Sequence, residues 1–217
     1  MNNNENEIMK AAGSFWIIIL TILAAVGCSD SEDMIAFKNV NLVPMTGEKI
    51  LTNQSVLIKG DRIYRIGKSD NLKIPQEATV IDGKGAYLMP GLADMHVHLK
   101  GEWPLSQLDL YLANGVTTVR DLDGRDFMLH WRQEIKQGQR TGPTIYAAGP
   151  VINGYENNAP ELASKLKSGY DCLKLYSYFS KDDYKKSLKT AHAQNLYTVG
   201  HIPFAVGLDG VIAGGMN

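Results

Sequence analysis

Apolar and polar residues alternate over short stretches in the first third of the chain. Turn sequences that contain Gly with Asp, Glu or Lys separate these stretches. Short β-branched runs bounded by such turns are typical of hairpins. The pattern predicts a small β-sandwich-like domain over residues 34–90, with strands at Ile35–Val43, Ser55–Lys59, Arg62–Ile66 and Thr79–Ile81.

After Pro90 the pattern changes to strands that alternate with helices. Strands are expected at Leu92–Leu99, Val116–Leu122, Thr144–Ile152, Asp171–Ser177 and Tyr197–His201. Helices are expected at Leu105–Asn114, Phe127–Gln137, Glu161–Lys167, Asp182–Gln194 and Val206–Ala213. Repeated strand–helix units imply an α/β fold in which helices cover a parallel sheet.

Both a (β/α)₈ TIM-type barrel and a doubly wound sheet fit this order of elements. A complete barrel takes about 250 residues. The region 91–217 holds about five strands. The sequence therefore predicts either an open sheet or an incomplete barrel.

The composition of the chain argues against a nucleic-acid partner. The 217 residues are 44% hydrophobic and 21% charged, with a formal net charge of −1. These values are ordinary for a soluble globular protein. Because there is no basic excess, we expect no nucleic-acid partner.

The amino end predicts export. Residues 14–27 carry no charge and follow Lys10. They are too few for a comfortable membrane span of about 20 residues, and suit the apolar region of a secretory signal. Ala25–Cys28 resembles a lipoprotein processing box, in which Cys28 is acylated. We expect a signal peptide at 1–28, a tether at 29–33, and a lipid-anchored bacterial lipoprotein in the periplasm or on the cell surface. The alternative is an uncleaved anchor helix.

Candidate metal ligands lie at the ends of the predicted strands. His96 and His98 stand two apart in the first strand, so both imidazoles are expected on one face. Asp94 is expected to share that face and could orient an imidazole. His201 closes the fifth strand. Neutral imidazoles are common metal ligands, so the pattern indicates a metal site.

A lysine is expected to point into the sheet interior. Lys174 lies in the fourth strand and shares a face with Cys172 and Tyr176. A buried ammonium is costly unless its charge is removed or paired. Carboxylation by carbon dioxide would convert it to an anionic carbamate that is able to bridge two cations.

Three segments together resemble a known family. They are the stretch Val80–Gly85 that ends the β-domain, the run Pro90–Leu99, and Gly115–Leu122. The chain from about residue 35 is similar to the metal-dependent amidohydrolases. The branch indicated contains imidazolonepropionase-like enzymes and prolidase-like enzymes that cleave dipeptides.

The resemblance implies a barrel with two divalent metal ions, with zinc the expected metal. His96 and His98 would hold the more buried ion, carboxylated Lys174 would bridge, and His201 would bind the second ion. Activated water would then hydrolyse a carbon–nitrogen bond of a small-molecule or dipeptide-like substrate. A further histidine and a catalytic aspartate of the family have no counterpart here, so no catalytic residue is assigned, and the 217-residue chain is expected to be poorly folded and inactive.

Other readings stay open. A non-catalytic surface lipoprotein and a nonfunctional product of a frameshifted gene are the alternatives to an enzyme. Arg120 and Asp121 either pair with each other or line the mouth of the pocket. Tyr176 and Tyr178 either touch substrate or fill the strand end. The sequence indicates no oligomeric state.

Overall fold

The computed structural model describes residues 33–101, 106–155 and 169–217. The chain divides into two compact units, Met1–Pro90 and Gly91–Asn217. The predicted leader with Cys28 and the helix expected at Glu161–Lys167 lie outside the described residues. Across the described residues, no helix has the length and apolarity to cross a membrane.

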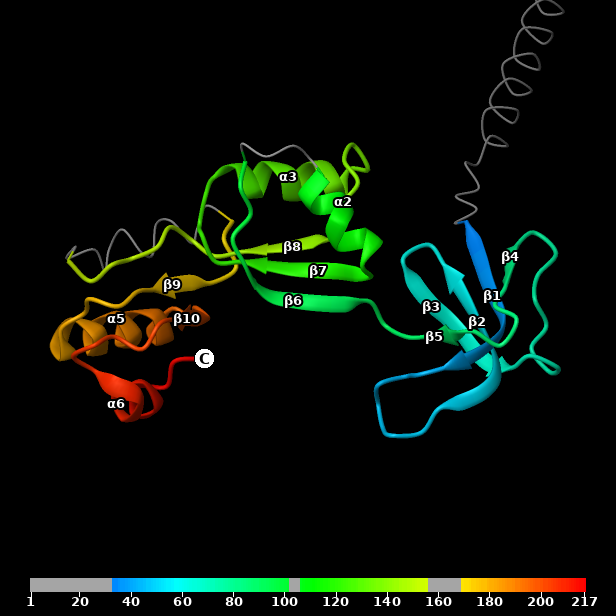
Figure 1. Cartoon of the computed structure of the whole chain (residues 1–217), viewed down its shortest axis with the longest axis horizontal. Helices are drawn as coiled ribbons and strands as arrows, with labels where there is room; N and C mark the ends of the chain where they lie inside the picture. The colour runs from blue at the N-terminus through cyan, green and yellow to red at the C-terminus, as the bar shows by residue number, and fades with distance from the viewer. Residues whose placement is uncertain (1–32, 102–105, 156–168) are drawn as a thin grey trace, which may run out of the picture. The chain divides into compact units, whose positions relative to one another are not determined.

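The first unit is a five-stranded mixed sheet (Figure 1). The antiparallel pairs β1–β2 and β2–β3 are the hairpins that the sequence predicts. The last two strands instead run parallel to β1. The strands are β1 (Met34–Leu42), β2 (Leu51–Lys59), β3 (Arg62–Lys68), β4 (Thr79–Asp82) and β5 (Tyr87–Leu88).

The turn between β4 and β5 does not reverse the chain, so these two strands do not form a hairpin. The Gly85 N–H donates to the Asn39 carbonyl at 2.7 Å, so the chain continues along β1. Asn39 and Lys84 both adopt left-handed backbone conformations, with φ of 56° and 49°. The Asp82 carboxylate accepts from the Lys84 N–H at 2.9 Å and from the Asn39 amide at 3.1 Å, which lowers its pKa. The five strands of the first unit therefore share one sheet, where the sequence predicts a sandwich-like domain.

The second unit contains five parallel strands whose spatial order follows the chain. β6 pairs with β7, β7 with β8, and β9 with β10. Isolated parallel bridges from Ala148 to Cys172 and from Ile152 to Leu175 join the two groups. The strands are β6 (Leu92–Val97), β7 (Val116–Asp121), β8 (Thr144–Ala147), β9 (Leu173–Leu175) and β10 (Thr198–Gly200).

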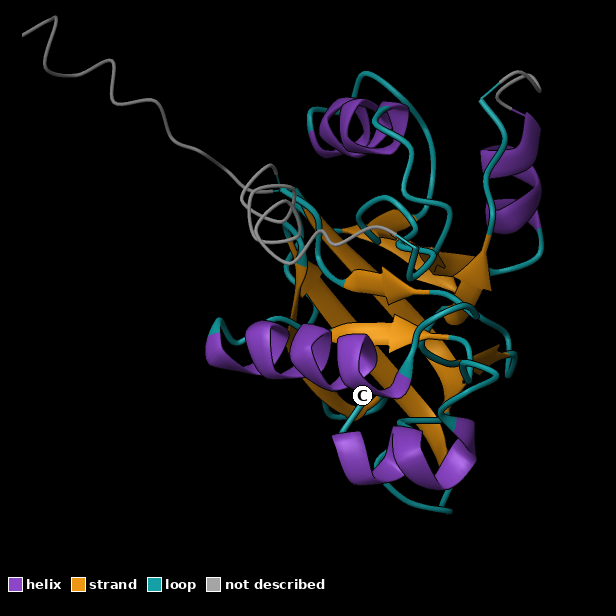
Figure 2. Ribbon diagram, turned by 90° about the vertical axis from the view of Figure 1, so that its left-hand side faces the viewer, coloured by secondary structure: helices purple, strands orange, loops and turns teal. Residues whose placement is uncertain are grey.

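Helices connect these strands and form their outer layer (Figure 2). The helices are α2 (Ser106–Ala113), α3 (Phe127–Lys136), α5 (Lys181–Ala193) and α6 (Gly207–Gly214). Each begins and ends within two residues of its predicted bounds. The five parallel strands lie in chain order, without the reversal of order of a doubly wound sheet, which confirms the prediction of a barrel-type α/β fold.

The core of the second unit lies between strands and helices. One buried cluster packs Leu108 of α2 and Met128 of α3 against Val119 of β7. Another packs Leu188 of α5 and Val211 of α6 against Leu173 and Leu175 of β9. The opposite face of the strands holds a smaller buried cluster of Leu122, Ala148, Cys172 and Val199 together with polar side chains. The candidate ligands lie on that opposite face.

Helix α2 offers a matched pair of leucines that tests this core. Leu108 is fully buried, whereas Leu110 is 61% exposed. Leu108→Ala should lower the free energy of unfolding by about 2–5 kcal/mol, because it leaves a cavity in the cluster. Leu110→Ala should lower it by less than about 1 kcal/mol. Urea unfolding followed by circular dichroism measures both, and equal losses would contradict the assigned helix face.

Candidate metal centre

The strand β6 carries a bulge at the predicted ligand pair. Asp94 pairs with Val119, but Val97 pairs with Asp121. Three residue steps along β6 therefore match two steps along β7. Partners in a parallel ladder project to the same side. Asp94 and Val97 therefore lie on the helix side with Val119, while His96 lies on the opposite side. The bulge overturns the expectation that Asp94 shares a face with the histidines.

Asp94 contacts the main chain of the first ligand. Its Oδ1 accepts from the His96 backbone N–H at 3.2 Å. The carboxylate thus holds the bulged peptide rather than an imidazole ring.

The two histidines face each other. His96 Nε2 and His98 Nε2 lie 3.4 Å apart, and their rings stack with centroids 5.4 Å apart at 18°. Without a cation, this distance suits an N–H···N hydrogen bond between neutral imidazoles. Two nitrogens that bind one tetrahedral zinc at about 2.0–2.1 Å lie about 3.3–3.4 Å apart. The pair therefore already has the spacing of a chelate.

Lys174 is buried next to these rings. It lies in β9 and is 1% exposed. Burial lowers its pKa, and the Arg120 guanidinium lowers it further, while Cys172 opposes the shift. No carboxylate of the described residues is among the charges that act on it. A larger share of this amine is therefore neutral than for an exposed lysine, and the neutral amine is the form that reacts with carbon dioxide.

His201 follows β10 and is held by its neighbour strand. Its backbone N–H donates to the Leu175 carbonyl at 3.0 Å, and its Nδ1 lies 3.0 Å from Ser177 Oγ. Burial lowers the pKa of His201 most, and the charges of Lys174 and His96 lower it further. Ser177 contacts Nδ1 of His201, and the described structure assigns no hydrogen bond to Nε2. A ring nitrogen without a hydrogen bond is available to bind a metal.

Charge effects connect the predicted ligands, because the pKa of His96 responds to Lys174 and His98, and that of His201 responds to Lys174, His96 and His98. Burial lowers the pKa of His96 most, then the charge of Lys174, then that of His98. Within the described stretches, no three His, Cys, Asp and Glu side chains stand close enough to hold one ion. His201 therefore does not bind the same ion as the pair His96 and His98. A group of ligands that includes all three histidines has to include Lys174 as well.

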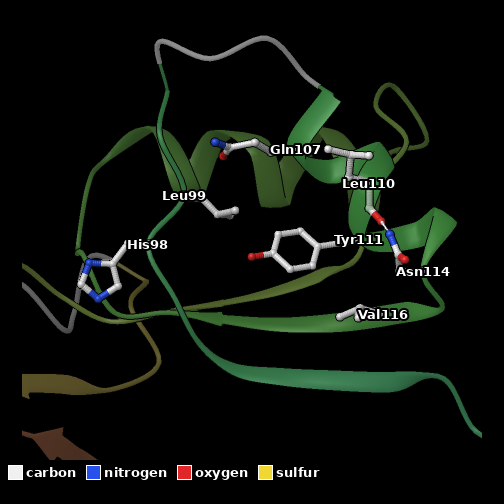
Figure 3. A pocket seen from close by; sticks show the side chains of 7 residues that line it. All are labelled: His98, Leu99, Gln107, Leu110, Tyr111, Asn114 and Val116. Carbon is white, nitrogen blue, oxygen red and sulfur yellow. Dashed lines mark hydrogen bonds between the residues drawn. The ribbon is translucent and has the colours of Figure 1, made fainter.

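A pocket of about 420 Å³ lies beside the same strand end (Figure 3). Its lining includes His98 and Leu99 of the strand end and Tyr111 and Asn114 after it. Figure 3 shows the Tyr111 hydroxyl directed toward Leu99 and His98. Burial raises the pKa of Tyr111, so this hydroxyl stays protonated.

No family model matches the chain. Similar proteins are found among known sequences and among solved structures. The chain is 40% identical over 89 residues to the adenine deaminase of Staphylothermus marinus, covering 39% of this chain and 15% of that protein. It is 49% identical over 47 residues to the imidazolonepropionase of Alkaliphilus metalliredigens, covering 20% and 11%. The matched parts are thus a small share of these longer relatives.

A solved structure shows the same fold over most of the chain. The crystal structure of a Xaa-Pro dipeptidase with bound methionine in the active site superposes with a TM-score of 0.70 at 18% identity. It matches 85% of this chain, which spans 60% of that structure. This chain is a relative of the amidohydrolases. The sequence likeness includes imidazolonepropionase, and the likeness to the dipeptidase is one of fold.

This amidohydrolase relative has two features that sequence reasoning missed. The Asp121 carboxylate is fully buried and accepts backbone N–H bonds from Leu99 at 2.7 Å, Asp123 at 2.9 Å and Gly124 at 3.4 Å. Burial raises its pKa and these bonds oppose the rise. Arg120 instead donates to the Met95 carbonyl at 2.8 Å. The two residues therefore do not pair with each other, and Asp121 faces away from the ligands.

The second missed feature is the contact of Ser177 with His201. Its only sequence signal is that Ser177 follows Lys174 by three residues. The ladder of β9 and β10 is needed to place it opposite His201.

Asp121 and Asp123 form a second matched pair for measurement. Asp121→Ala leaves three backbone N–H groups at the end of β6 and β7 without their acceptor, so it should lower the free energy of unfolding by about 2–4 kcal/mol. Asp123 forms a surface pair with Arg125 at 2.6 Å, and Asp123→Ala should cost about 0–1 kcal/mol. Chemical denaturation of both variants checks this. A larger loss for Asp123→Ala would show that Asp121 is not the anchor of this strand end.

Proposed function

We propose that the chain provides the first ligands of a metal-dependent hydrolase that acts on carbon–nitrogen bonds. The observation that carries this proposal is the 3.4 Å spacing of His96 Nε2 and His98 Nε2 beside a buried lysine. The relatives named adenine deaminase and imidazolonepropionase and the dipeptidase structure support the reaction class. The proposed substrate is a small amide, a cyclic amide or a dipeptide-like molecule.

The donor set fits two divalent cations, with zinc the proposed metal. His96 and His98 would hold one ion, His201 the other, and Lys174, once carboxylated, would supply oxygen to both. Such ions generate a nucleophilic water near neutral pH and polarise a carbonyl group. Imidazole and carboxylate-like oxygen are ligands that suit zinc.

The protein's own groups prepare this site. Lowered pKa values keep His96 and His201 neutral, so their nitrogens are available without first losing a proton. Ser177 orients the His201 ring, and Asp94 holds the peptide of His96. His96 and His201 are therefore each held by a second group before a cation arrives.

The lowered pKa of Lys174 leads to a chemical proposal. The neutral Nζ attacks carbon dioxide, a C–N bond forms, and one proton leaves to solvent, which gives an anionic carbamate. This removes the buried positive charge and replaces it with a ligand for cations. Without it, an ammonium would stand next to two cation sites.

We also propose that the protein is a lipoprotein of the cell envelope, anchored through Cys28. Its support is the uncharged stretch 14–27 followed by Cys28.

Zinc binding separates the enzyme reading from a non-catalytic lipoprotein. The purified chain should retain about two zinc ions after dialysis, and His96→Ala should weaken binding at least about tenfold. His192→Ala is the control, because His192 bonds the Gly215 carbonyl at 3.1 Å on an outer helix. Elemental analysis measures the metal content.

The pH dependence of zinc binding follows from the sign of the pKa shifts. Because His96 and His201 have pKa values below the ordinary 6.5, they stay neutral at a pH where an ordinary imidazole is protonated. Zinc binding should therefore still be present at pH 6.5. It should be lost only at a lower pH, where His96 and His201 become protonated. A parent protein that holds no zinc at neutral pH with added bicarbonate would refute the proposal.

Carboxylation of Lys174 is tested separately with ¹³C-labelled bicarbonate. The zinc-loaded chain should show a carbamate carbon signal by NMR, and Lys174→Met should abolish it while keeping an unbranched side chain that is one heavy atom shorter. Lys185→Met, on the exposed side of α5, is the control and should leave the signal unchanged. A signal that survives in Lys174→Met would assign the carbamate elsewhere.

A further inference from the structure

Four aromatic rings form a continuous array at the carboxyl ends of the strands. Tyr178 is at its centre. Its ring centroid lies 5.0 Å from that of Tyr155, stacked at 19°, and 5.8 Å from that of Phe204, edge-on at 60°. Tyr176 lies 6.0 Å from Tyr178 on the other side. The rings come from three loops, which follow β8, β9 and β10.

The array begins at the candidate metal centre. The Tyr176 ring centroid lies 4.2 Å from that of His201. From His201 the rings therefore lead outward through Tyr176 and Tyr178 to Tyr155 and Phe204. A ligand that lies on the outer rings and extends along the array reaches His201.

The outer rings do not serve the core. Phe204 is 80% exposed, Tyr155 75% and Tyr178 47%. Phe179, by contrast, is 2% exposed and packs with Tyr184 in the helix layer. Contiguous exposed apolar groups of this kind mark places where a ligand or partner binds.

The main chain holds the array in place. The Tyr178 N–H donates to the Asn153 carbonyl at 3.1 Å, and the Phe204 N–H donates to the Ser177 carbonyl at 3.0 Å. Gly154 has a φ of +97°, and a Cβ there would lie 2.6 Å from the Phe179 nitrogen. Only glycine therefore lets the loop of Tyr155 approach the segment after β9 this closely. A rigid array loses little conformational entropy when a ligand binds.

Ser177 connects the array to the ligands. Its hydroxyl lies 3.0 Å from His201 Nδ1, and its carbonyl accepts from the Phe204 N–H. One residue thus fixes the position of a candidate metal ligand and of the outermost ring.

We infer that Tyr155, Tyr178 and Phe204 form a binding surface for a flat aromatic ring of the substrate. The ring lies against their faces and edges, and the amide that it carries points along Tyr176 to His201. This assigns the substrate to the class of amides with an aromatic group on one side of the scissile bond. The inference rests on the proposed function for the direction of the amide, but not for the binding of the ring.

Two amides of similar size test the surface, benzamide and cyclohexanecarboxamide. Only benzamide offers a flat π system. Titration of the full chain, followed by NMR, should give a dissociation constant roughly 3- to 10-fold lower for benzamide. The double variant Tyr178→Leu/Phe204→Leu keeps an apolar surface but should bring the ratio of the two constants to about 1.

Tyr64→Leu is the matched control, because Tyr64 is a 58% exposed tyrosine of the first unit. It should leave the ratio unchanged, and circular dichroism should show the same fold for all variants. Equal dissociation constants in the parent chain, or a preference for benzamide that survives in the double variant, would overturn the inference.

The same titration in His96→Ala distinguishes the two proposals. If the rings bind the aromatic group, the preference for benzamide persists in this variant although zinc binding is weakened. If the parent binds no zinc but still prefers benzamide, the proposed function fails and the ring surface stands.

Discussion

The buried carboxylate of Asp121 ties together the strand ends on which the candidate metal centre depends. It accepts from the N–H of Leu99, directly after the histidine pair, and from two N–H groups of the turn after β7. Burial of a carboxylate is unfavourable on its own, as its raised pKa shows. Three backbone donors offset that penalty. The result is a fixed end of β6, and the spacing of His96 and His98 is only useful if that end is fixed.

The bulge in β6 is the second constraint. A regular strand would send Asp94, His96 and His98 to one face. The extra residue moves Asp94 to the helix side and lets its carboxylate bond the His96 N–H. The His96 and His98 rings therefore lie on a face that the Asp94 side chain does not share.

The sequence predicts the strand–helix order well, because apolar periodicity and glycine stops are local signals. The lysine and the three histidines could be found for the same reason, since each lies near the end of a predicted strand. The parallel pairing of β4 and β5 with β1 could not be found, because it depends on the distant backbone of Asn39. The role of Asp121 was hidden likewise: its partners are main-chain N–H groups, which leave no trace in residue identity.

Lys174 shows why the cluster is more than a set of neighbouring residues. An ammonium that is 1% exposed, near Arg120 and without a carboxylate among the groups that act on it, is held in an unfavourable state. Three remedies exist: loss of the proton, a counter-ion, or covalent conversion to an anion. Loss of the proton leaves a neutral amine close to two imidazoles, which is the condition for reaction with carbon dioxide. The resulting carbamate would in turn repel anions and attract cations between His96 and His201, so the same burial that destabilises the lysine favours the metal centre that the histidines are spaced to hold.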